Sequence, residues 1–151
     1  MATEIERKFL VHDSGFLELA EYSRDIKQGY LTGLTENGAS FRVRIANEQA
    51  FLTVKGKNCG ISRAEFEYQI PLEDAEEMFA VCGSRIVEKT RYYLHYAGNL
   101  WEVDVFKGRH SGLVVAEIEL PDENAVFEKP PFAAEEVTGD FKYSNLSLAL
   151  S

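Results

Sequence analysis

The feature that most constrains the fold is a period-two alternation of charged and apolar residues that recurs along the chain. In the stretch 4–11, Glu4, Glu6 and Lys8 alternate with mostly apolar neighbours, among which Arg7 is the exception. Successive side chains of a β-strand point to opposite faces of a sheet, so the pattern predicts strands with one charged and one apolar face. Eight strands are predicted, at residues 4–11, 25–32, 40–45, 50–55, 63–70, 87–93, 100–106 and 114–120.

Helical stretches are predicted between and after these strands, at residues 14–22, 72–82, 122–127 and 145–150. The second follows Pro71 and carries acids in its N-terminal half, where the helix dipole favours them. Turn signals at 36–38, 97–99 and 107–109 separate several strands. No linker or repeat divides the 151 residues, so we expect one domain over 1–151.

The charged faces carry more ionised groups than a dry core could hold, because each group loses its hydration on burial. The acids on these faces are Glu4, Glu6, Glu65, Glu67, Glu102, Asp104, Glu117 and Glu119. The bases are Lys8, Arg42, Arg44, Lys55, Lys89 and Arg91. Taken alone, each strand fits a half-buried sheet with a solvated face. Taken together, they favour one closed sheet with a wet, charged interior and an apolar outer face covered by helices and a partner subunit.

The pairing of like charges points to phosphate chemistry. Two carboxylates at positions i and i+2 of a strand lie roughly 6 to 7 Å apart and repel each other. Mg²⁺ and Mn²⁺ prefer carboxylate oxygen and would relieve this repulsion. Paired Arg side chains bind phosphate oxygens bidentately, and Lys adds a point charge. The charged faces therefore predict a metal-dependent site for a small phosphate compound.

Composition excludes several other classes of function. The net charge of -9 argues against binding a nucleic-acid backbone or an anionic membrane. Cys59 and Cys82 match neither a zinc nor a redox spacing. No signal peptide or membrane-spanning run is visible, so we expect a soluble cytoplasmic protein. No Ser-His-Asp or Cys-His set indicates a covalent intermediate.

The order of the charged pairs resembles a known family. The opening Glu4-Ile5-Glu6-Arg7-Lys8 is similar to the E-x-E-x-K start of the CYTH superfamily, the triphosphate tunnel metalloenzymes. The later pairs follow in that family's order: Arg42/Arg44, Lys55, Glu65/Glu67, residues 88–91, Glu102/Asp104, Glu117/Glu119 and the closing segment 140–145. This resemblance spans the chain and implies an α+β fold, in which an eight-stranded antiparallel β-barrel forms a tunnel with a few peripheral helices.

The resemblance also implies roles for individual residues. Mg²⁺ or Mn²⁺ would be held by Glu4, Glu6, Asp104, Glu117 and Glu119, with Glu102 a weaker candidate. The phosphates would be bound by Lys8, Arg42, Arg44, Lys55, Lys89, Arg91 and Lys142, the last where the C-terminal helix could close one tunnel mouth. The catalytic set would be Glu4, Glu6, Lys8, Lys89 and Arg91. Glu65 and Glu67 would either bind a second metal or pair with the bases, and pairing is slightly favoured.

The expected activity follows from the most similar members, which are compact bacterial enzymes that cleave inorganic tripolyphosphate. They share Gln28-Gly29-Tyr30 and the run at 88–92. We therefore expect metal-dependent hydrolysis of tripolyphosphate to pyrophosphate and phosphate. Three alternatives stay open: a class IV adenylate cyclase, a thiamine or nucleoside triphosphatase, and a non-catalytic phosphate- or polyphosphate-binding domain. The apolar outer face also raises a homodimer as an expectation.

Overall fold

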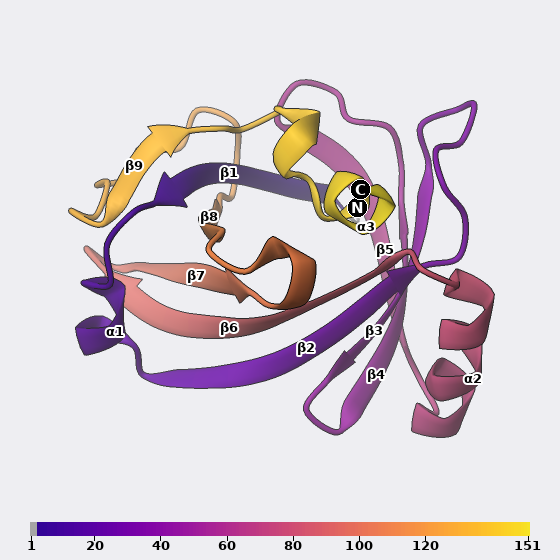
Figure 1. Ribbon diagram of the computed structural model, residues 1–151. Helices are drawn as coiled ribbons and strands as arrows, with labels where there is room; N and C mark the ends of the chain where they lie inside the picture. Colours follow the sequence, from indigo (N-terminus) through magenta and orange to yellow (C-terminus); the bar gives the residue numbers. More distant parts are fainter. Residues whose placement is uncertain (1–2) are drawn as a thin grey trace.

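A closed antiparallel barrel forms the body of the protein, as the computed structural model of residues 3–151 shows (Figure 1). The strands are β1 (Thr3–Val11), β2 (Tyr22–Tyr30), β3 (Ser40–Ala46), β4 (Gln49–Lys55), β5 (Ser62–Ile70), β6 (Ile86–Tyr96), β7 (Asn99–Phe106), β8 (Val114–Glu119) and β9 (Ala133–Glu136). Eight of them follow each other in the order β5-β4-β3-β2-β6-β7-β8-β1, and a β5–β1 pairing closes the circle. The expected α+β fold with an eight-stranded antiparallel barrel is confirmed. Met1 and Ala2 of the expected domain lie outside the described residues.

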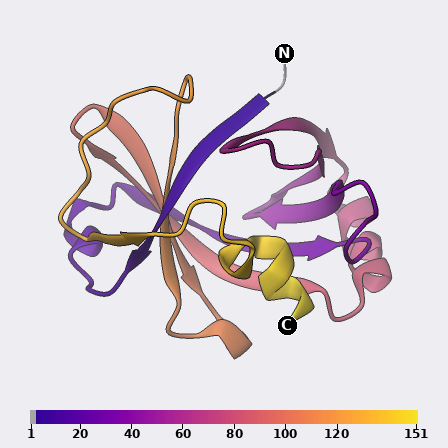
Figure 2. The same ribbon diagram turned by 90° about the horizontal axis from the view of Figure 1, so that it is seen from above.

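The first strand closes the barrel by dividing its length between two neighbours. Residues 3–5 of β1 pair with β5, and residues 6–10 pair with β8. Figure 2 shows β1 running from one half of the sheet to the other. The charged opening of the chain therefore lies at the seam of the barrel, where residues from the two ends of the strand order meet.

All eight predicted strands are present, with boundaries shifted by a few residues. The β6–β7 hairpin turns at Ala97 and Gly98, whose φ angles are 50° and 82°. Positive φ at both central residues matches the right-handed twist of the strands, and glycine adopts it without strain. The ninth strand, β9, was not predicted. It has four residues and no charged alternation, and it pairs with the C-terminal part of β1, at Phe9 and Val11.

Three α-helices accompany the barrel, α1 (Phe16–Leu19), α2 (Leu72–Cys82) and α3 (Asn145–Leu150), with two 3₁₀ turns, η1 (Gly108–His110) and η2 (Phe141–Tyr143). The predicted helix at 122–127 is wrong. There the Asp122 carboxylate accepts a hydrogen bond from the Asn124 backbone N–H at 2.8 Å. A side chain that satisfies a nearby backbone donor in this way competes with helix formation.

Helix α2 covers the outer face of β3 and β4 (Figure 1). Its Phe79 and Cys82 pack with Val43 and Ala50 of these strands. The contact is so close at β2 that a Cβ on Gly29 would lie 2.7 Å from the Cys82 Sγ atom. Glycine at this position therefore permits the helix to approach the sheet.

A second outer core lies under α1, β9 and the segment between β8 and β9. Trp101 is fully buried there, and its ring packs 5.7 Å from Phe9 and 6.4 Å from Phe132, centroid to centroid. Trp101 thus lies on the apolar outer face of the barrel. Within residues 3–151, no helix is long and apolar enough to cross a membrane.

Candidate functional site

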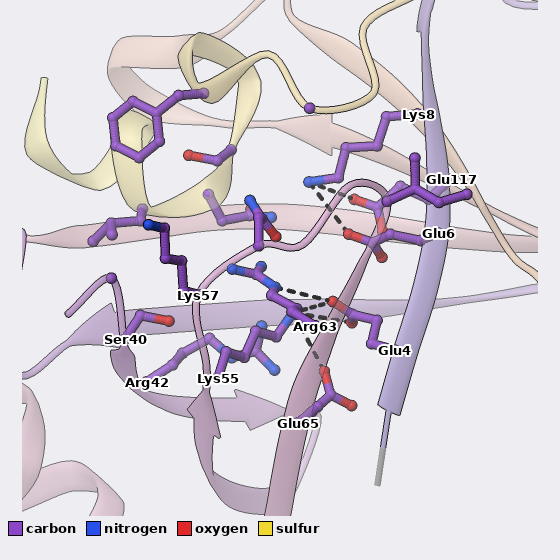
Figure 3. A pocket seen from close by; sticks show the side chains of 18 of the residues that line it. Glu4, Glu6, Lys8, Ser40, Arg42, Lys55, Lys57, Arg63, Glu65 and Glu117 are labelled. Atoms are coloured by element: carbon purple, nitrogen blue, oxygen red, sulfur yellow. Dashed lines mark hydrogen bonds and ion pairs between the residues drawn. The ribbon is translucent and has the colours of Figure 1, made fainter. Parts of the chain in front are cut away.

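The inner face of the barrel surrounds a cavity of about 480 Å³, and half of the residues that line it are charged (Figure 3). Its acids are Glu4, Glu6, Glu65, Glu67, Glu102, Glu117, Glu119 and Asp140. Its bases are Lys8, Lys55, Lys57, Arg42, Arg44, Arg63 and Arg91. A cavity of this size suits a small molecule. The structure thus brings together nine of the predicted site residues, namely Glu4, Glu6, Lys8, Arg42, Arg44, Lys55, Arg91, Glu117 and Glu119.

Strand register decides which charges face each other. Cross-strand partners lie on the same face of a sheet with their side chains in contact range. Lys55 lies opposite Glu65, and Lys8 lies opposite Glu117. Two pairs join like charges instead, because Glu6 lies opposite Glu119, and Glu102 lies opposite Glu117. Like charges in such positions destabilise a sheet, so these carboxylates call for a cation.

The carboxylates of Glu6, Glu117 and Glu119, which we call the acidic patch, lie where β1 and β8 pair. The Lys8 Nζ atom is 3.5 Å from Glu6 Oε1 and 3.8 Å from Glu117 Oε1. Burial first, and then the charge of Glu6, raises the pKa of Glu117. Burial and the surrounding carboxylates, with Glu4 the largest of these, raise the pKa of Glu119. Burial works against the Lys8 ammonium, but Glu117 and Glu6 outweigh it and raise its pKa. Negative charge in this patch is therefore only partly neutralised.

The donor chemistry of the acidic patch fits a hard divalent cation, because it offers several carboxylate oxygens whose mutual repulsion a cation would relieve. Within the described residues, no group of three or more His, Cys, Asp or Glu side chains is arranged closely enough to hold a metal ion. The Lys8 ammonium holds the position between Glu6 and Glu117 instead. The carboxylates are thus present on adjacent strands, and a bound cation would have to draw them together.

Glu4 lies near this patch but is neutralised by two bases. The Lys55 Nζ atom donates to both Glu4 carboxylate oxygens at 3.0 Å, and the Arg63 Nε atom lies 3.4 Å from Oε1 (Figure 3). Lys55 also contacts Glu65 at 3.3 Å. Glu65 and Glu67 therefore pair with bases here, Glu67 with Arg42 at 3.5 Å.

The guanidinium of Arg44 lacks a carboxylate partner. Its Nε atom donates to the Gln28 Oε1 atom at 2.9 Å, and no acid within residues 3–151 forms an ion pair with it. Burial first, then the nearby guanidiniums of Arg42 and Arg91, lower the pKa of Arg44 to about 10. The group remains a cation at neutral pH and offers an anion an unneutralised charge.

Lys89, Arg91 and Asp104 form a second arrangement, which we call the buried ion cluster. The Asp104 side chain is completely buried. Its Oδ2 atom accepts from Lys89 Nζ at 2.7 Å and from Arg91 Nη2 at 3.0 Å, and its Oδ1 atom accepts from Arg91 Nε at 2.7 Å. Burial disfavours the Asp104 carboxylate, but Arg91 and Lys89 hold its pKa well below the usual range.

Among the predicted site residues, the structure does not bring Asp104, Lys89 and Lys142 to the cavity wall. Lys89 is fully buried, and its Nζ also donates to Asn145 Oδ1 at 3.0 Å. Lys142 is exposed, and its Nζ lies 5.3 Å from the centre of the Tyr143 ring. Its neighbour Phe141 lines the cavity instead.

Helix α3 packs over one end of the barrel interior. Leu148 and Ala149 form one hydrophobic cluster with Tyr30, Val87 and Phe106, which continue the inner faces of their strands. The η1 turn holds the end of this helix, because Arg109 donates to the Leu148 and Ala149 carbonyl oxygens at 3.2 and 2.9 Å. The C-terminal segment thus forms part of the cavity wall, through Ser144, Asn145 and Leu146 among others.

Several cavity residues were not among the predicted site residues, chiefly Arg63, Lys57, Tyr30 and Asn145. Arg63 could have been found, because it shares the alternation of Glu65 and Glu67 on β5. Lys57 lies beyond the end of β4, where the alternation gives no direction. Asn145 reaches the cavity because α3 folds back over the barrel, and its place in the family-like closing segment 140–145 was the signal that could have found it.

A closed antiparallel barrel with opposed carboxylates and guanidiniums around one internal cavity defines a class of protein that receives a small, highly charged anion. The chain belongs to the CYTH domain family, whose model matches residues 2–149. It is 47% identical over 149 residues to an inorganic triphosphatase of Acetivibrio thermocellus, covering 98% of this chain and 94% of that relative. An inorganic triphosphatase of Nitrosomonas europaea is 41% identical, with 99% and 98% covered. A crystal structure of an inorganic triphosphatase superposes with a TM-score of 0.73 at 39% identity, covering 100% of this chain and 97% of the other.

Proposed function

We propose that this chain hydrolyses inorganic tripolyphosphate to pyrophosphate and phosphate with Mg²⁺ or Mn²⁺. The observation that carries this proposal is the arrangement of opposite chemistries around one cavity. In the strand order, β8 with Glu117 and Glu119 lies four strands from β3 with Arg42 and Arg44, which is half of an eight-stranded circle. A polyanion between them would meet guanidiniums on one side and a cation-binding patch on the other. The names of the two relatives support the same substrate.

The bases would bind and align the phosphate chain. Arg44 has no competing carboxylate, so its guanidinium is free to hold phosphate oxygens bidentately. Lys57 and Arg63 would add charge from the loop and strand on the neighbouring side of the cavity. Fixing the chain in this way places the scissile phosphorus in line with an attacking water, which lowers the barrier through positioning.

The acidic patch would hold the divalent cation and the water. A Mg²⁺ or Mn²⁺ ion held by these carboxylates would supply positive charge that favours the attack of water on a phosphate. The water oxygen forms the new bond to phosphorus, the anhydride P–O bond breaks, and pyrophosphate leaves. A carboxylate oxygen of Glu6, Glu117 or Glu119 accepts the proton from the water. Asp104 is not part of this set, because both of its oxygens already accept from Lys89 and Arg91.

A phosphate-release assay tests the proposal, with tripolyphosphate, ATP, GTP and thiamine triphosphate each offered with Mg²⁺ and Mn²⁺. We expect the fastest release from tripolyphosphate, and none when the divalent cation is removed with EDTA. Cyclic AMP formed from ATP would instead support the cyclase alternative. Tight binding of tripolyphosphate without turnover under both metals would overturn the proposal and support the phosphate-binding alternative.

The homodimer and the cytoplasmic location stay predictions. On the outer face of β5, Phe66 and Tyr68 are 45% and 62% exposed, which is consistent with a second copy covering this face. Sedimentation of the purified protein tests the dimer.

A further inference from the structure

The inner face of β2 contains a buried amide that the proposed mechanism does not use. Gln28 is completely buried and lies directly opposite Arg44 in the pairing of β2 with β3. Its Oε1 atom accepts from Arg44 Nε at 2.9 Å. A guanidinium nitrogen can only donate, so the amide oxygen has to face Arg44, and this fixes the orientation of the amide.

The amino group of the same amide has no partner. Gln28 Nε2 is one of three buried side-chain nitrogens or oxygens without a hydrogen bond in the described part of the chain, and Arg42 Nε is another. Buried donors are normally satisfied, so those without partners call for an explanation. Both atoms belong to residues on the inner faces of β2 and β3. Gln28 lies opposite Arg44, and Arg42 lies two residues from Arg44 on the same face of β3.

The choice of glutamine rather than glutamate has an electrostatic consequence. Lys89 and Arg91 carry positive charge close enough to Arg44 to affect the pKa values of these groups. A carboxylate at position 28 would be attracted by these cations and would form an ion pair with Arg44. Such a pair would cancel the charge that an incoming phosphate needs. A neutral amide can hold the guanidinium in place without cancelling it.

We propose that Gln28 is a positioning residue for the substrate anion: its amide oxygen orients the Arg44 guanidinium, which lines the cavity, and leaves the charge of that guanidinium available to the anion. This inference rests on the proposed function, since it assigns the anion to the Arg44 side of the cavity. It predicts that substrate affinity depends on the neutrality of residue 28 and not on its volume alone.

The test compares Gln28→Glu with Gln28→Met and a matched control. Gln28→Glu keeps the shape and the oxygen but adds a charge, and we expect KM for tripolyphosphate to rise by on the order of tenfold or more with a smaller change in kcat. The melting temperature should stay the same or rise, because the new carboxylate meets Arg44. Gln28→Met removes both polar atoms and should raise KM by a few-fold. Gln69→Glu is the control. Gln69 lies on the inner face of β5 and is exposed. It belongs to the same cross-strand row as Gln28, in which Gln28 pairs with Arg44, Arg44 with Phe51, and Phe51 with Gln69.

An unchanged KM in Gln28→Glu with a stable fold would overturn the inference, as would an equal rise in Gln69→Glu. Affinity is also measured as a Kd for tripolyphosphate by calorimetry in a Glu119→Gln background with Mg²⁺. If the wild-type chain binds tripolyphosphate but does not hydrolyse it, the proposed function fails while the Kd comparison still decides the role of Gln28. If Gln28→Glu lowers the melting temperature and leaves both KM and Kd unchanged, Gln28 has only a structural role.

Discussion

The β1–β8 pair and the β6–β7 pair carry the same kind of charged alternation but use it in opposite ways. On β6 and β7, Asp104 lies opposite Arg91, and its buried carboxylate is neutralised by Arg91 and Lys89. On β1 and β8, Glu6 lies opposite Glu119, so like charges meet. The pKa of Asp104 is lowered, whereas those of Glu117 and Glu119 are raised. Asp104 therefore serves as a counter-ion, whereas Glu119 remains available to a cation, and the cross-strand partner of each, Arg91 or Glu6, accounts for the difference.

The largest effect is expected from Glu119→Gln in the acidic patch. It keeps the size of the side chain and removes one ionised oxygen donor. The site therefore binds the divalent cation less tightly, and less positive charge is available to stabilise the transition state. We expect phosphate release from tripolyphosphate to fall by about 10²-fold or more. Raising the Mg²⁺ concentration should recover part of the rate. Activity within a few-fold of wild type would remove Glu119 from the metal-binding set.

The second prediction tests the other side of the comparison with Asp104→Asn. This substitution leaves the buried Lys89 without a carboxylate, and Arg91 with Glu102 at 3.1 Å as its nearest acid. Removing one partner of a buried ion pair costs about 3–5 kcal/mol of stability. For a chain of this length the melting temperature should fall by on the order of 10 °C, measured without metal. If Asp104 instead acted as a metal ligand, the melting temperature of the metal-free protein would change little and only the metal-dependent activity would fall.

The third prediction is a stability profile with opposite signs in two pH ranges, measured by thermal unfolding in EDTA. The raised pKa values of Glu117 and Glu119 mean that folding opposes their ionisation, so stability should increase as the pH falls from 7 through those pKa values. The lowered pKa of Asp104 stabilises the fold above its unfolded value near 4, and this contribution is lost as the pH falls further. Glu119→Gln should weaken the first change and leave the second. A stability that falls steadily from pH 7 downward would contradict this reading of the acidic patch.

The smallest effect is expected at Lys142, with Arg63 as its matched comparison. Both are bases, but only Arg63 lines the cavity and contacts Glu4. Arg63→Gln should raise KM for tripolyphosphate by several-fold, whereas Lys142→Gln should change kcat/KM by less than about twofold. A loss of activity in Lys142→Gln equal to that of Arg63→Gln would mean that the C-terminal segment moves toward the substrate during the reaction.

Much of the architecture was predictable because strand patterning is local. The alternation of Glu4, Glu6 and Lys8 assigns these side chains to the inner face whatever their partners are. The same rule would have assigned Arg63 to that face. The segment at 122–127 was predicted wrongly because a six-residue stretch that begins with two acids fits either a helix or a turn, and the Asp122 side chain favours the turn.

The sequence by itself determined the eight strands, the face on which each charge lies and which acids and bases point into the barrel. Only the tertiary structure decided which of these acids pair with bases and which do not. Closure through β1 and β5 and the register of each strand pair depend on contacts between residues distant in the chain. Asp104 and Glu119 look alike in the alternation, but Asp104 meets Arg91 across its pair and Glu119 meets Glu6. A charge at a fixed position on a strand is stabilised or destabilised by its neighbour across the sheet, and that neighbour is set by the fold of the whole barrel.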